Sequence, residues 1–231
     1  MAQEAVTAVW MRPERGARGP VAVHSRAELT AAAVELADRG GLSAVSMRQV
    51  ATALGTGQAS LYRYLSGRDD LLDLMADAVV GEVDLDVPLC GEPVEDLLAL
   101  AVRTKAALVR HPWVAGLPPE PLRLGPRGLD YLEYALRAME PSPLPGRTKT
   151  ELVGLMNALV TQFAGVTAQH DGGANGRRAA QAAYLREAAA RGEHPRVAAA
   201  LGDPGEVADG EDAEAGFARM MRKVLTGLLA S

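Results

Sequence analysis

The chain has 231 residues, of which 48% are hydrophobic and 23% are charged, which excludes intrinsic disorder and allows a sizeable folded core. The net charge of −5 excludes a uniformly basic nucleic-acid coat, and no apolar run approaches the roughly 20 residues of a membrane span, so we expect no membrane partner. The single cysteine, Cys90, excludes an intramolecular disulfide framework and a cysteine-based zinc site, and it favours a cytoplasmic protein.

Residues 1–24 are rich in Gly and Pro between positions 13 and 20, and we expect a flexible basic arm there. Residues 10–68 carry eight arginines and four acidic residues, so positive charge is concentrated near the amino end of an acidic chain. This asymmetry is typical of a small polyanion-binding module attached to another kind of domain. Arginines also gather by chance in a composition rich in Ala, Gly and Arg, so charge alone leaves nucleic-acid binding open.

Three short helices are expected in the next part of the chain. The first begins at the capping box Ser-Arg-Ala-Glu at 25–28 and ends at the glycine pair at 40–41. A second box, Ser-Met-Arg-Gln at 46–49, begins the next helix. After Leu54 a break of only three residues precedes a short helix over 58–65.

Two helices separated by a tight, Gly-containing break form a helix-turn-helix, and Gly55 gives the backbone the freedom that the break needs. The second helix of such a motif enters the major groove of DNA, while the first crosses the phosphate backbone. Three residues then lie at base edges: Gln58, Ala59 and Ser60. Further contacts, mainly to phosphates and sugars, are expected from Ser46, Arg48, Thr56, Tyr62, Arg63, Tyr64 and Arg68. Such turns also occur in proteins that never touch DNA, and Tyr62 is equally compatible with a core position.

The remainder of the chain also has a helical pattern, with prolines at the loops and no strand alternation. The expected helices cover residues 69–85, 92–110, 126–140, 147–170, 177–191, 194–201 and 212–230. The predicted fold class is therefore all-α. We expect a three-helix helix-turn-helix DNA-binding domain over 25–70 and a second helical domain over 71–231.

Three motifs follow one another in the first domain: ATALG at 51–55, LYRYL at 61–65 and RDDLL at 68–72. Together with the helix before them they resemble the DNA-binding domain of TetR-type transcriptional repressors. The resemblance implies that the carboxy-terminal helices form a ligand-binding and dimerisation domain. Gln58 and Ala59 stand where the family frequently has Lys-Gly, so the operator sequence does not carry over.

Two apolar stripes at helical spacing are candidates for a dimer interface. They consist of Leu152, Leu155, Leu159 and Phe163, and of Phe217, Met221, Val224, Leu225 and Leu228. Paired with their symmetry mates they would form a four-helix interface; the alternative is that both stripes pack inward within one chain. A homodimer also follows from reading two half-sites, whose centres lie one helical turn, about 34–36 Å, apart or a multiple of that distance.

Polar, aromatic and methionine side chains on apolar helix faces are candidates for an effector pocket. Ordinary packing is the alternative for each of them: Met75, Trp113, Tyr131, Tyr134, Met156, Asn157, Thr161 and Gln162. No metal or other cofactor is expected, because His24, His111, His170 and His194 are too scattered for a local metal motif.

These observations predict a ligand-responsive, DNA-binding transcriptional regulator, and the family resemblance favours a repressor over an activator. We expect a homodimer that holds palindromic double-stranded operator DNA until a small hydrophobic effector moves the helix over 69–85. Two alternatives stay open: a helical module that binds a protein partner through a stripe at 217–229, and a helical enzyme of unrecognised class. The sequence identifies neither the effector nor the operator nor the regulated genes.

Overall fold

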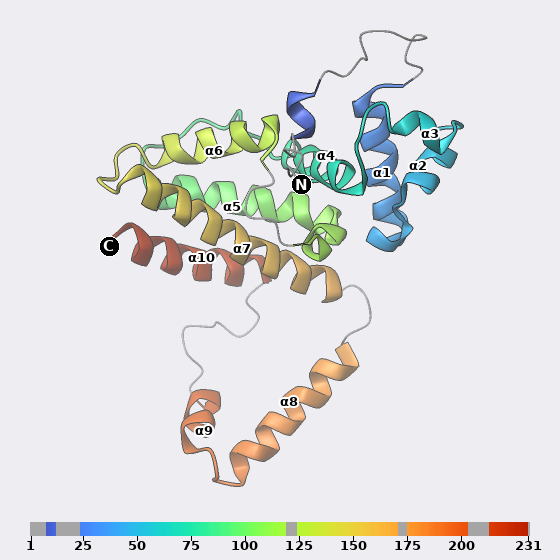
Figure 1. Cartoon of the computed structure of the whole chain (residues 1–231). Helices are drawn as coiled ribbons and strands as arrows, with labels where there is room; N and C mark the ends of the chain where they lie inside the picture. Colours follow the sequence, from blue (N-terminus) through green and yellow to red (C-terminus); the bar gives the residue numbers. More distant parts are fainter. Residues whose placement is uncertain (1–7, 13–23, 119–123, 171–174, 203–212, 231) are drawn as a thin grey trace, which may run out of the picture.

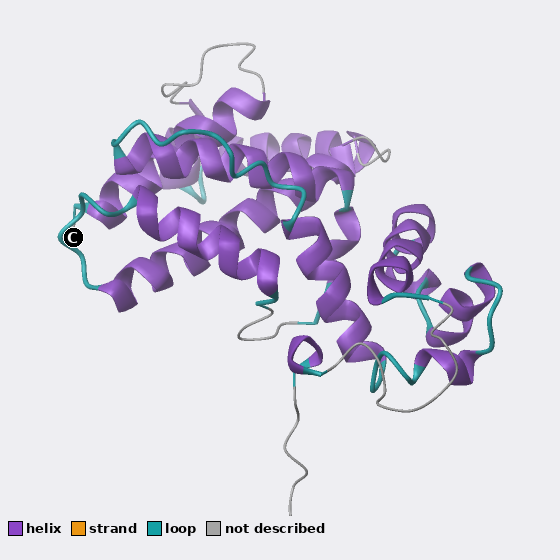
Figure 2. Cartoon of the chain, turned by 90° about the horizontal axis from the view of Figure 1, so that it is seen from above, coloured by secondary structure: helices purple, strands orange, loops and turns teal. Residues whose placement is uncertain are grey.

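The structure, a computed structural model, describes residues 8–12, 24–118, 124–170, 175–202 and 213–230. Within these ranges the chain forms helices joined by turns and loops and no strand, which confirms the predicted all-α fold class (Figures 1 and 2). None of these helices is long and apolar enough to cross a membrane. Most of the predicted arm lies outside the described residues. In chain order the helices are η1 (Val9–Met11), α1 (Arg26–Gly40), η2 (Leu42–Ala44), α2 (Met47–Ala53), α3 (Gln58–Leu61), α4 (Arg68–Val80), α5 (Pro93–Arg110), η3 (Pro112–Gly116), α6 (Pro126–Ala138), α7 (Gly146–His170), α8 (Asn175–Ala190), α9 (Pro195–Gly202) and α10 (Ala213–Leu229).

The first helix, α1, begins and ends as its sequence predicts. The Ser25 side chain accepts a hydrogen bond from the Glu28 backbone N–H at 3.2 Å, and the Glu28 carboxylate accepts one from the Ser25 backbone N–H at 2.7 Å. These hydrogen bonds complete the capping box and lower the pKa of the Glu28 carboxyl, because they favour its charged form. After α1, Gly41 has a φ of 70°, in the left-handed region that favours glycine.

The second predicted capping box forms in one half only. Ser46 accepts a hydrogen bond from the Gln49 backbone N–H at 3.2 Å, while the Ser46 hydroxyl donates to the Gln49 side-chain oxygen at 2.6 Å. In the turn between α2 and α3, Gly55 adopts a φ of 64°, as the tight break requires. α3 ends at Leu61 rather than at residue 65, because the helical hydrogen-bond ladder there gives way to turns.

The amino-terminal helices α1 to α4 pack around a common apolar core. Leu29, Leu61 and Leu72 are fully buried in it, and burial of a side chain of this size contributes about 1.5–3 kcal/mol. Val9 of η1 and Trp113 of η3 belong to the same core, although both lie outside the segment 25–70. The amino-terminal core is therefore completed by elements from either side of the predicted DNA-binding domain.

A second core lies among α5, α6, α7 and α10, and α5 packs against both α7 and α10 (Figure 1). Leu100, Met156 and Phe217 are among its buried residues. α4 leads from the first core to the second and packs against α1, α5 and α6. It ends at Val80, five residues short of the predicted end at 85, where the chain turns through Gly81. α4 thus connects the amino-terminal core with the carboxy-terminal core.

The helices α8 and α9 form a hairpin that stands away from the rest of the chain (Figure 1). They pack against each other, and their larger apolar side chains stay exposed within the single chain. These side chains are Tyr184, Leu185, Val197 and Leu201.

Candidate DNA-binding site and domain junction

The short helix α3 has one face in the amino-terminal core and one in solvent. Leu61 is fully buried, whereas Gln58, Ala59 and Arg63 are exposed, and Tyr62 is 52% exposed. The Gln58 side-chain amide donates to the Tyr62 hydroxyl at 3.5 Å, so these two side chains are neighbours on the outer face. Because the second helix of a helix-turn-helix enters the major groove, this outer face is the candidate reading surface.

Two hydroxyls in the same motif are engaged within the turn. Ser60 donates to the Gly57 carbonyl at 2.6 Å, and its oxygen lies 2.8 Å from the Thr56 hydroxyl. Since the Ser60 hydrogen is used on Gly57, Thr56 is the donor between the two hydroxyls. Thr56 and Ser60 therefore fix the start of α3, and Ser60 keeps only acceptor capacity toward a base.

Tyr64, a predicted DNA contact, is only 6% exposed. Its ring packs in the amino-terminal core, and its hydroxyl accepts a hydrogen bond from the His24 backbone N–H at 3.4 Å. Its carbonyl accepts one from the Arg26 side chain at 3.3 Å. Tyr64 therefore holds the start of α1 against α3, and it leaves little surface for a phosphate.

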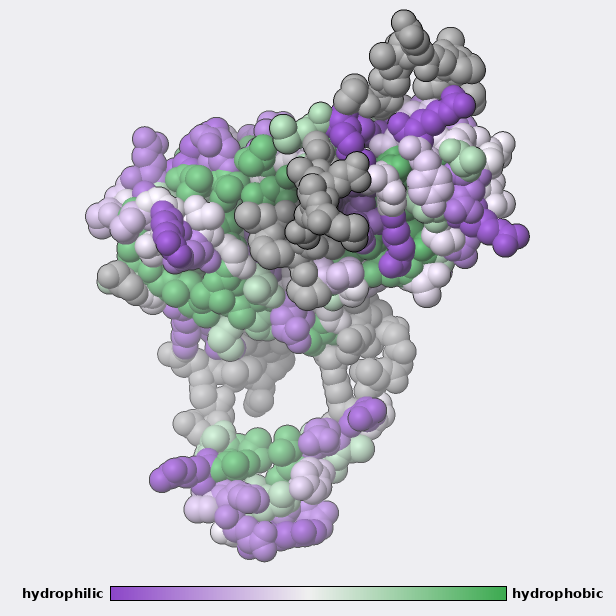
Figure 3. All heavy atoms as spheres, viewed as in Figure 1, coloured by the Kyte–Doolittle hydropathy of each residue, from purple (hydrophilic) through white to green (hydrophobic). Residues whose placement is uncertain are grey.

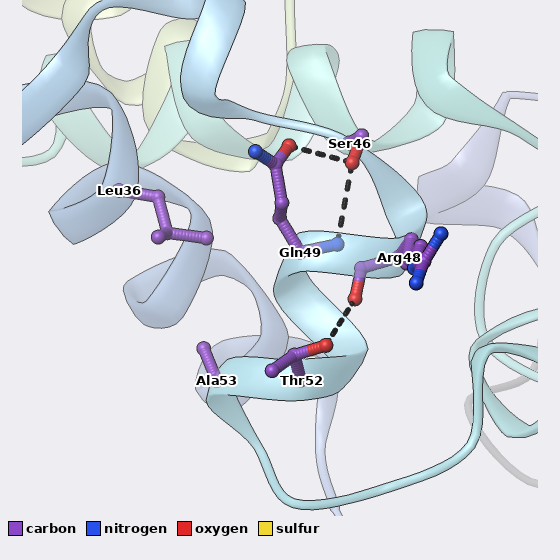
Figure 4. Close-up of a pocket in the computed structure, with 6 residues that line it drawn as sticks. All are labelled: Leu36, Ser46, Arg48, Gln49, Thr52 and Ala53. Carbon is purple, nitrogen blue, oxygen red and sulfur yellow. Dashed lines mark hydrogen bonds between the residues drawn. The ribbon is translucent and has the colours of Figure 1, made fainter.

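Three other predicted DNA contacts stand at helix starts: Ser46 precedes α2, Arg48 lies in its first turn, and Arg68 begins α4. Arg48 is exposed and extends away from α1 in Figure 4, whereas the Arg68 guanidinium donates to the Leu42 carbonyl at 3.3 Å. A hollow of about 600 Å³ lies between α1 and α2. Its lining residues are Leu36, Ser46, Arg48, Gln49, Thr52 and Ala53.

In the carboxy-terminal core, three helices share a set of polar side chains. The Tyr131 hydroxyl donates to the Asn157 side-chain oxygen at 2.7 Å and lies 3.1 Å from the Thr104 hydroxyl. Burial raises the pKa of Tyr131 to about 12, so its phenol is neutral at physiological pH. Tyr134, one turn further along α6, donates to the Val87 carbonyl at 2.9 Å. Tyr131 and Asn157 therefore form a hydrogen-bonded pair between α6 and α7, while Tyr134 is bonded to the connection between α4 and α5.

The other predicted pocket residues take no part in these two hydrogen bonds. Met75 and Trp113 are buried in the amino-terminal core, and Met156 is buried in the carboxy-terminal core. The Thr161 hydroxyl donates to the Asn157 carbonyl, one turn earlier in α7, at 2.8 Å. Gln162 is exposed on the same helix.

The predicted dimer stripes divide between the core and the surface of the single chain. Leu152, Phe217, Met221 and Leu225 are buried against their own chain. Leu159, Phe163, Val224 and Leu228 are half-buried. Leu155 is 46% exposed and lies on the same face of α7 as Val166, which is 37% exposed.

A group of hydrogen-bonded side chains joins the two cores. The Asp38 carboxylate of α1 accepts from the Trp113 indole N–H at 2.7 Å and lies 2.7 Å from His111 Nδ1. The other ring nitrogen of His111 lies 3.0 Å from Glu82, which also pairs with Arg110 at 2.7 Å. His111 is buried, so this group ties α1 to the end of α5. A movement of α5 relative to α1 would have to break these bonds.

Residues 29–75 match the tetR family of bacterial regulatory proteins, and residues 90–231 match a tetracyclin repressor-like carboxy-terminal domain. The chain belongs to the TetR family. One relative is an HTH-type transcriptional regulator of Saccharopolyspora erythraea, 32% identical over 226 residues that cover 97% of this chain and 92% of that protein. Another is the HTH-type transcriptional repressor DrrR1 of Streptomyces coeruleorubidus, 39% identical over 146 residues that cover 63% of this chain and 53% of DrrR1.

Solved structures of ActR from Streptomyces coelicolor share the fold of this TetR-family chain. ActR in complex with actinorhodin has a TM-score of 0.75 and 27% identity, covering 90% of this chain and 97% of ActR. ActR in complex with (S)-DNPA has a TM-score of 0.73 and 26% identity, covering 90% of this chain and 98% of ActR. The predicted family is thus confirmed: the chain is a DNA-binding transcriptional regulator of the TetR family and not an enzyme.

Sequence reasoning missed the acidic residues at the junction between the two cores of this TetR-family regulator. Asp38 and Glu82 are exposed and Asp77 is buried, and no local sequence motif singles out any of the three. Each acquires its partners from segments far along the chain, such as Trp113 for Asp38. The described part of the chain holds no group of three or more His, Cys, Asp or Glu residues suited to a metal ion.

Proposed function

We propose that this TetR-family regulator is a repressor, which acts as a homodimer that binds a palindromic operator through α3 and is released by a small hydrophobic effector. The observation that carries the proposal is that the α3 region has a buried side and an exposed side. Leu61 is buried, whereas Gln58, Tyr62 and Arg63 are exposed. Glutamine bonds adenine edges in the major groove, while Tyr62 and Arg63 are suited to phosphates. The name of DrrR1 as a repressor supports the sign of regulation.

The effector is expected to bind in the carboxy-terminal helical domain. The complexes of ActR with actinorhodin and with (S)-DNPA support an effector site in this kind of fold. In this chain Tyr131 and Asn157 are bonded to each other in the second core, and a ligand with polar groups would exchange hydrogen bonds with them. An apolar ligand with a few polar groups fits such surroundings.

Signal transfer is expected to run through the bonds that join the two cores. α4 packs against α1 on one side and against α5 and α6 on the other. Asp38 is bonded to Trp113 and His111, so α1 is also tied directly to the end of α5. A ligand that shifts α5 or α6 would change the spacing of the two reading helices in the dimer. A coupling of about 1–3 kcal/mol weakens operator binding roughly 5–150-fold.

The proposed dimer interface uses the surface that α7 and α10 leave uncovered. Leu155 and Met220 are 46% and 47% exposed, and apolar residues gather over these helices on the face seen in Figure 3. The α8–α9 hairpin adds Tyr184 and Leu201, which are 61% and 50% exposed. Exposed apolar side chains on α7, α10 and the α8–α9 hairpin favour a second copy of the chain as the partner.

DNase I footprinting of genomic fragments bound by the purified protein tests this function. We expect a protected palindrome whose half-site centres are about 34–36 Å apart, or a multiple of that spacing. The double variant Tyr62→Ala, Arg63→Ala should lose protection while keeping its helical circular dichroism. Arg147→Ala, at an exposed position of α7, is the matched control and should protect the same sites. An unchanged footprint with the double variant would exclude α3 as the reading helix.

A further inference from the structure

Residues 8–12, the part of the predicted arm that the structure describes before α1, pack against the folded chain. Val9 of η1 is buried in the amino-terminal core, and the Trp10 ring lies against Gly125 at the start of α6. Figure 1 shows η1 between α6 and α1. These residues precede the segment 29–75 that matches the tetR family, so the match assigns them no role. They contact both the DNA-binding domain and the first helix of the second core that follows η3.

Arg12 joins this segment to α4. Its guanidinium forms an ion pair with the Asp70 carboxylate, and both side chains are largely shielded from solvent. Asp70 also accepts hydrogen bonds from the backbone N–H of Ser66 and from its hydroxyl, the second at 2.7 Å. An ion pair shielded in this way is screened by salt less than an exposed one. Arg12 is therefore held at the turn that leads from α3 to α4.

The backbone of Arg12 is linked to the end of the reading helix through Arg26. The Arg12 carbonyl accepts a hydrogen bond from Arg26 Nη1 at 2.9 Å, and Arg26 Nε donates to the Tyr64 carbonyl at 3.3 Å. Tyr64 lies three residues after the end of α3. One guanidinium thus bonds a carbonyl that precedes α1 and a carbonyl that follows α3. Because α3 has only four residues, its direction depends on the contacts at its ends more than on its own hydrogen bonds.

We propose that Arg12 is a positioning residue for operator recognition, which acts through Arg26 to fix the direction of α3. The inference rests on the proposed reading of DNA by α3. Base contacts are directional hydrogen bonds and depend on the direction of the helix, whereas the attraction to phosphates is independent of sequence. The Arg12 guanidinium is engaged by Asp70 and acts without touching DNA. A protein that lacks this ion pair should still bind DNA, but it should distinguish the operator less well from other sequences.

Fluorescence anisotropy of the full-length protein with two DNA duplexes tests this role. One duplex is the fragment protected in the DNase I footprint, and the other has the same base composition in scrambled order. Arg12→Met should bind the protected fragment at least about fivefold more weakly, as the loss of one base contact does, and the scrambled duplex within about twofold of wild type. Arg39→Met breaks an exposed ion pair of α1 and is the matched control. It should change neither affinity by more than about twofold.

A direct phosphate contact of Arg12 would give a different result. Arg12→Met would then weaken binding to both duplexes alike and make the slope of log affinity against log salt concentration shallower by about one unit. That outcome overturns the proposal.

A double-mutant cycle tests whether Arg12 acts through its ion pair. Asp70→Asn should also reduce the preference for the protected fragment, and the double variant Arg12→Met, Asp70→Asn should lose no more than the worse of the two single variants. Additive losses in the double variant would mean that the two residues act separately, which contradicts the proposal.

Thermal unfolding separates positioning from stability, and all affinities are measured well below the unfolding midpoint of each variant. A lower midpoint of Arg12→Met with an unchanged preference for the protected fragment would make Arg12 a stabilising residue only, against the proposal. The double variant Tyr62→Ala, Arg63→Ala tests the proposed function itself. If that variant keeps the preference, the reading of DNA by α3 is wrong. If it loses the preference while Arg12→Met keeps it, only the role of Arg12 is wrong.

Discussion

Asp77 of α4 accepts a hydrogen bond from the backbone N–H of Gly128 in α6 at 2.8 Å, and its second oxygen accepts one from the Arg127 N–H at 3.3 Å. The residue before α6 is Gly125, which has no side chain to cap the helix. A carboxylate from another helix therefore accepts hydrogen bonds from the first amides of α6. Its negative charge also interacts favourably with the positive end of the α6 dipole. The start of α6 is thus tied to the position of α4.

Asp77→Ala should lower the free energy of unfolding by about 1–2 kcal/mol, because it leaves buried backbone donors without an acceptor. Urea unfolding followed by circular dichroism measures the change. Asp130→Ala, at an exposed position of the same α6, is the matched control and should stay within about 0.5 kcal/mol of wild type. Equal stability of both variants would show that water caps α6 as well as Asp77 does.

Gly125 lies where α6, α4 and η1 meet, and a Cβ at this position would overlap the Asp77 carboxylate and the Trp10 ring. Gly125→Ala should therefore destabilise the protein by about 1–3 kcal/mol, as overpacking does. Gly176→Ala is the control, because a Cβ there meets no atom within 4 Å. It should leave the thermal unfolding midpoint unchanged or raise it slightly. A Gly125→Ala midpoint equal to that of wild type would mean that Trp10 moves aside at no cost.

The exposed arginines of the helix-turn-helix should act through phosphates. Each phosphate contact contributes about −0.9 to the slope of log affinity against log salt concentration. Arg48→Ala and Arg63→Ala should each make this slope shallower by about one unit and weaken binding to all DNA sequences alike. Fluorescence anisotropy at several salt concentrations measures the slope, with Arg147→Ala as the control. A variant that changes sequence preference at constant slope would instead indicate a base contact.

Asp70, near the amino end of α4, should make the free energy of unfolding depend on pH. Burial alone would raise the pKa of its carboxyl, but hydrogen bonds from Arg12 and Ser66 outweigh it and hold the pKa below its usual range. A lowered folded-state pKa contributes stability above the ordinary value and loses it as the pH falls through the folded-state value. The stability difference between wild type and Asp70→Asn should therefore be present at neutral pH and shrink below about pH 4.

Urea unfolding at a series of pH values measures this difference. Asp69→Asn changes the neighbouring, exposed carboxylate of the same helix turn and serves as the control. If the advantage of wild type over Asp70→Asn were the same at every pH, its source would be packing and not the charge of Asp70.

Local signals in the sequence were sufficient for much of the fold and of the reading helix. The Ser25 capping box and the positive φ at Gly41 and Gly55 depend on residues within one turn, so spacing alone predicts them. The outward face of α3 follows in the same way from the burial of Leu61. Tyr64 shows the limit: its place in the core is set by contacts with α1, which no local pattern records.

The domain junction was beyond the reach of sequence patterns for the same physical reason. Asp38 and Trp113 are 75 residues apart in the chain, and only the packing of η3 against α1 makes them partners. Trp113 was predicted as a pocket residue because an aromatic side chain after a helix end fits a pocket as well as a core.

Leu155 offers the sharpest test of the homodimer. It is 46% exposed on α7, and a charge placed there would be buried against the second copy, where it has no partner. Leu155→Glu should therefore sediment as a monomer at micromolar concentration and lose operator affinity, because a single reading helix binds one half-site only. Leu129→Glu changes a leucine of α6 that is 57% exposed and should remain a dimer with unchanged affinity. Because the more exposed leucine is the control, a general effect of adding charge is excluded. A dimeric Leu155→Glu would move the interface away from this face of α7.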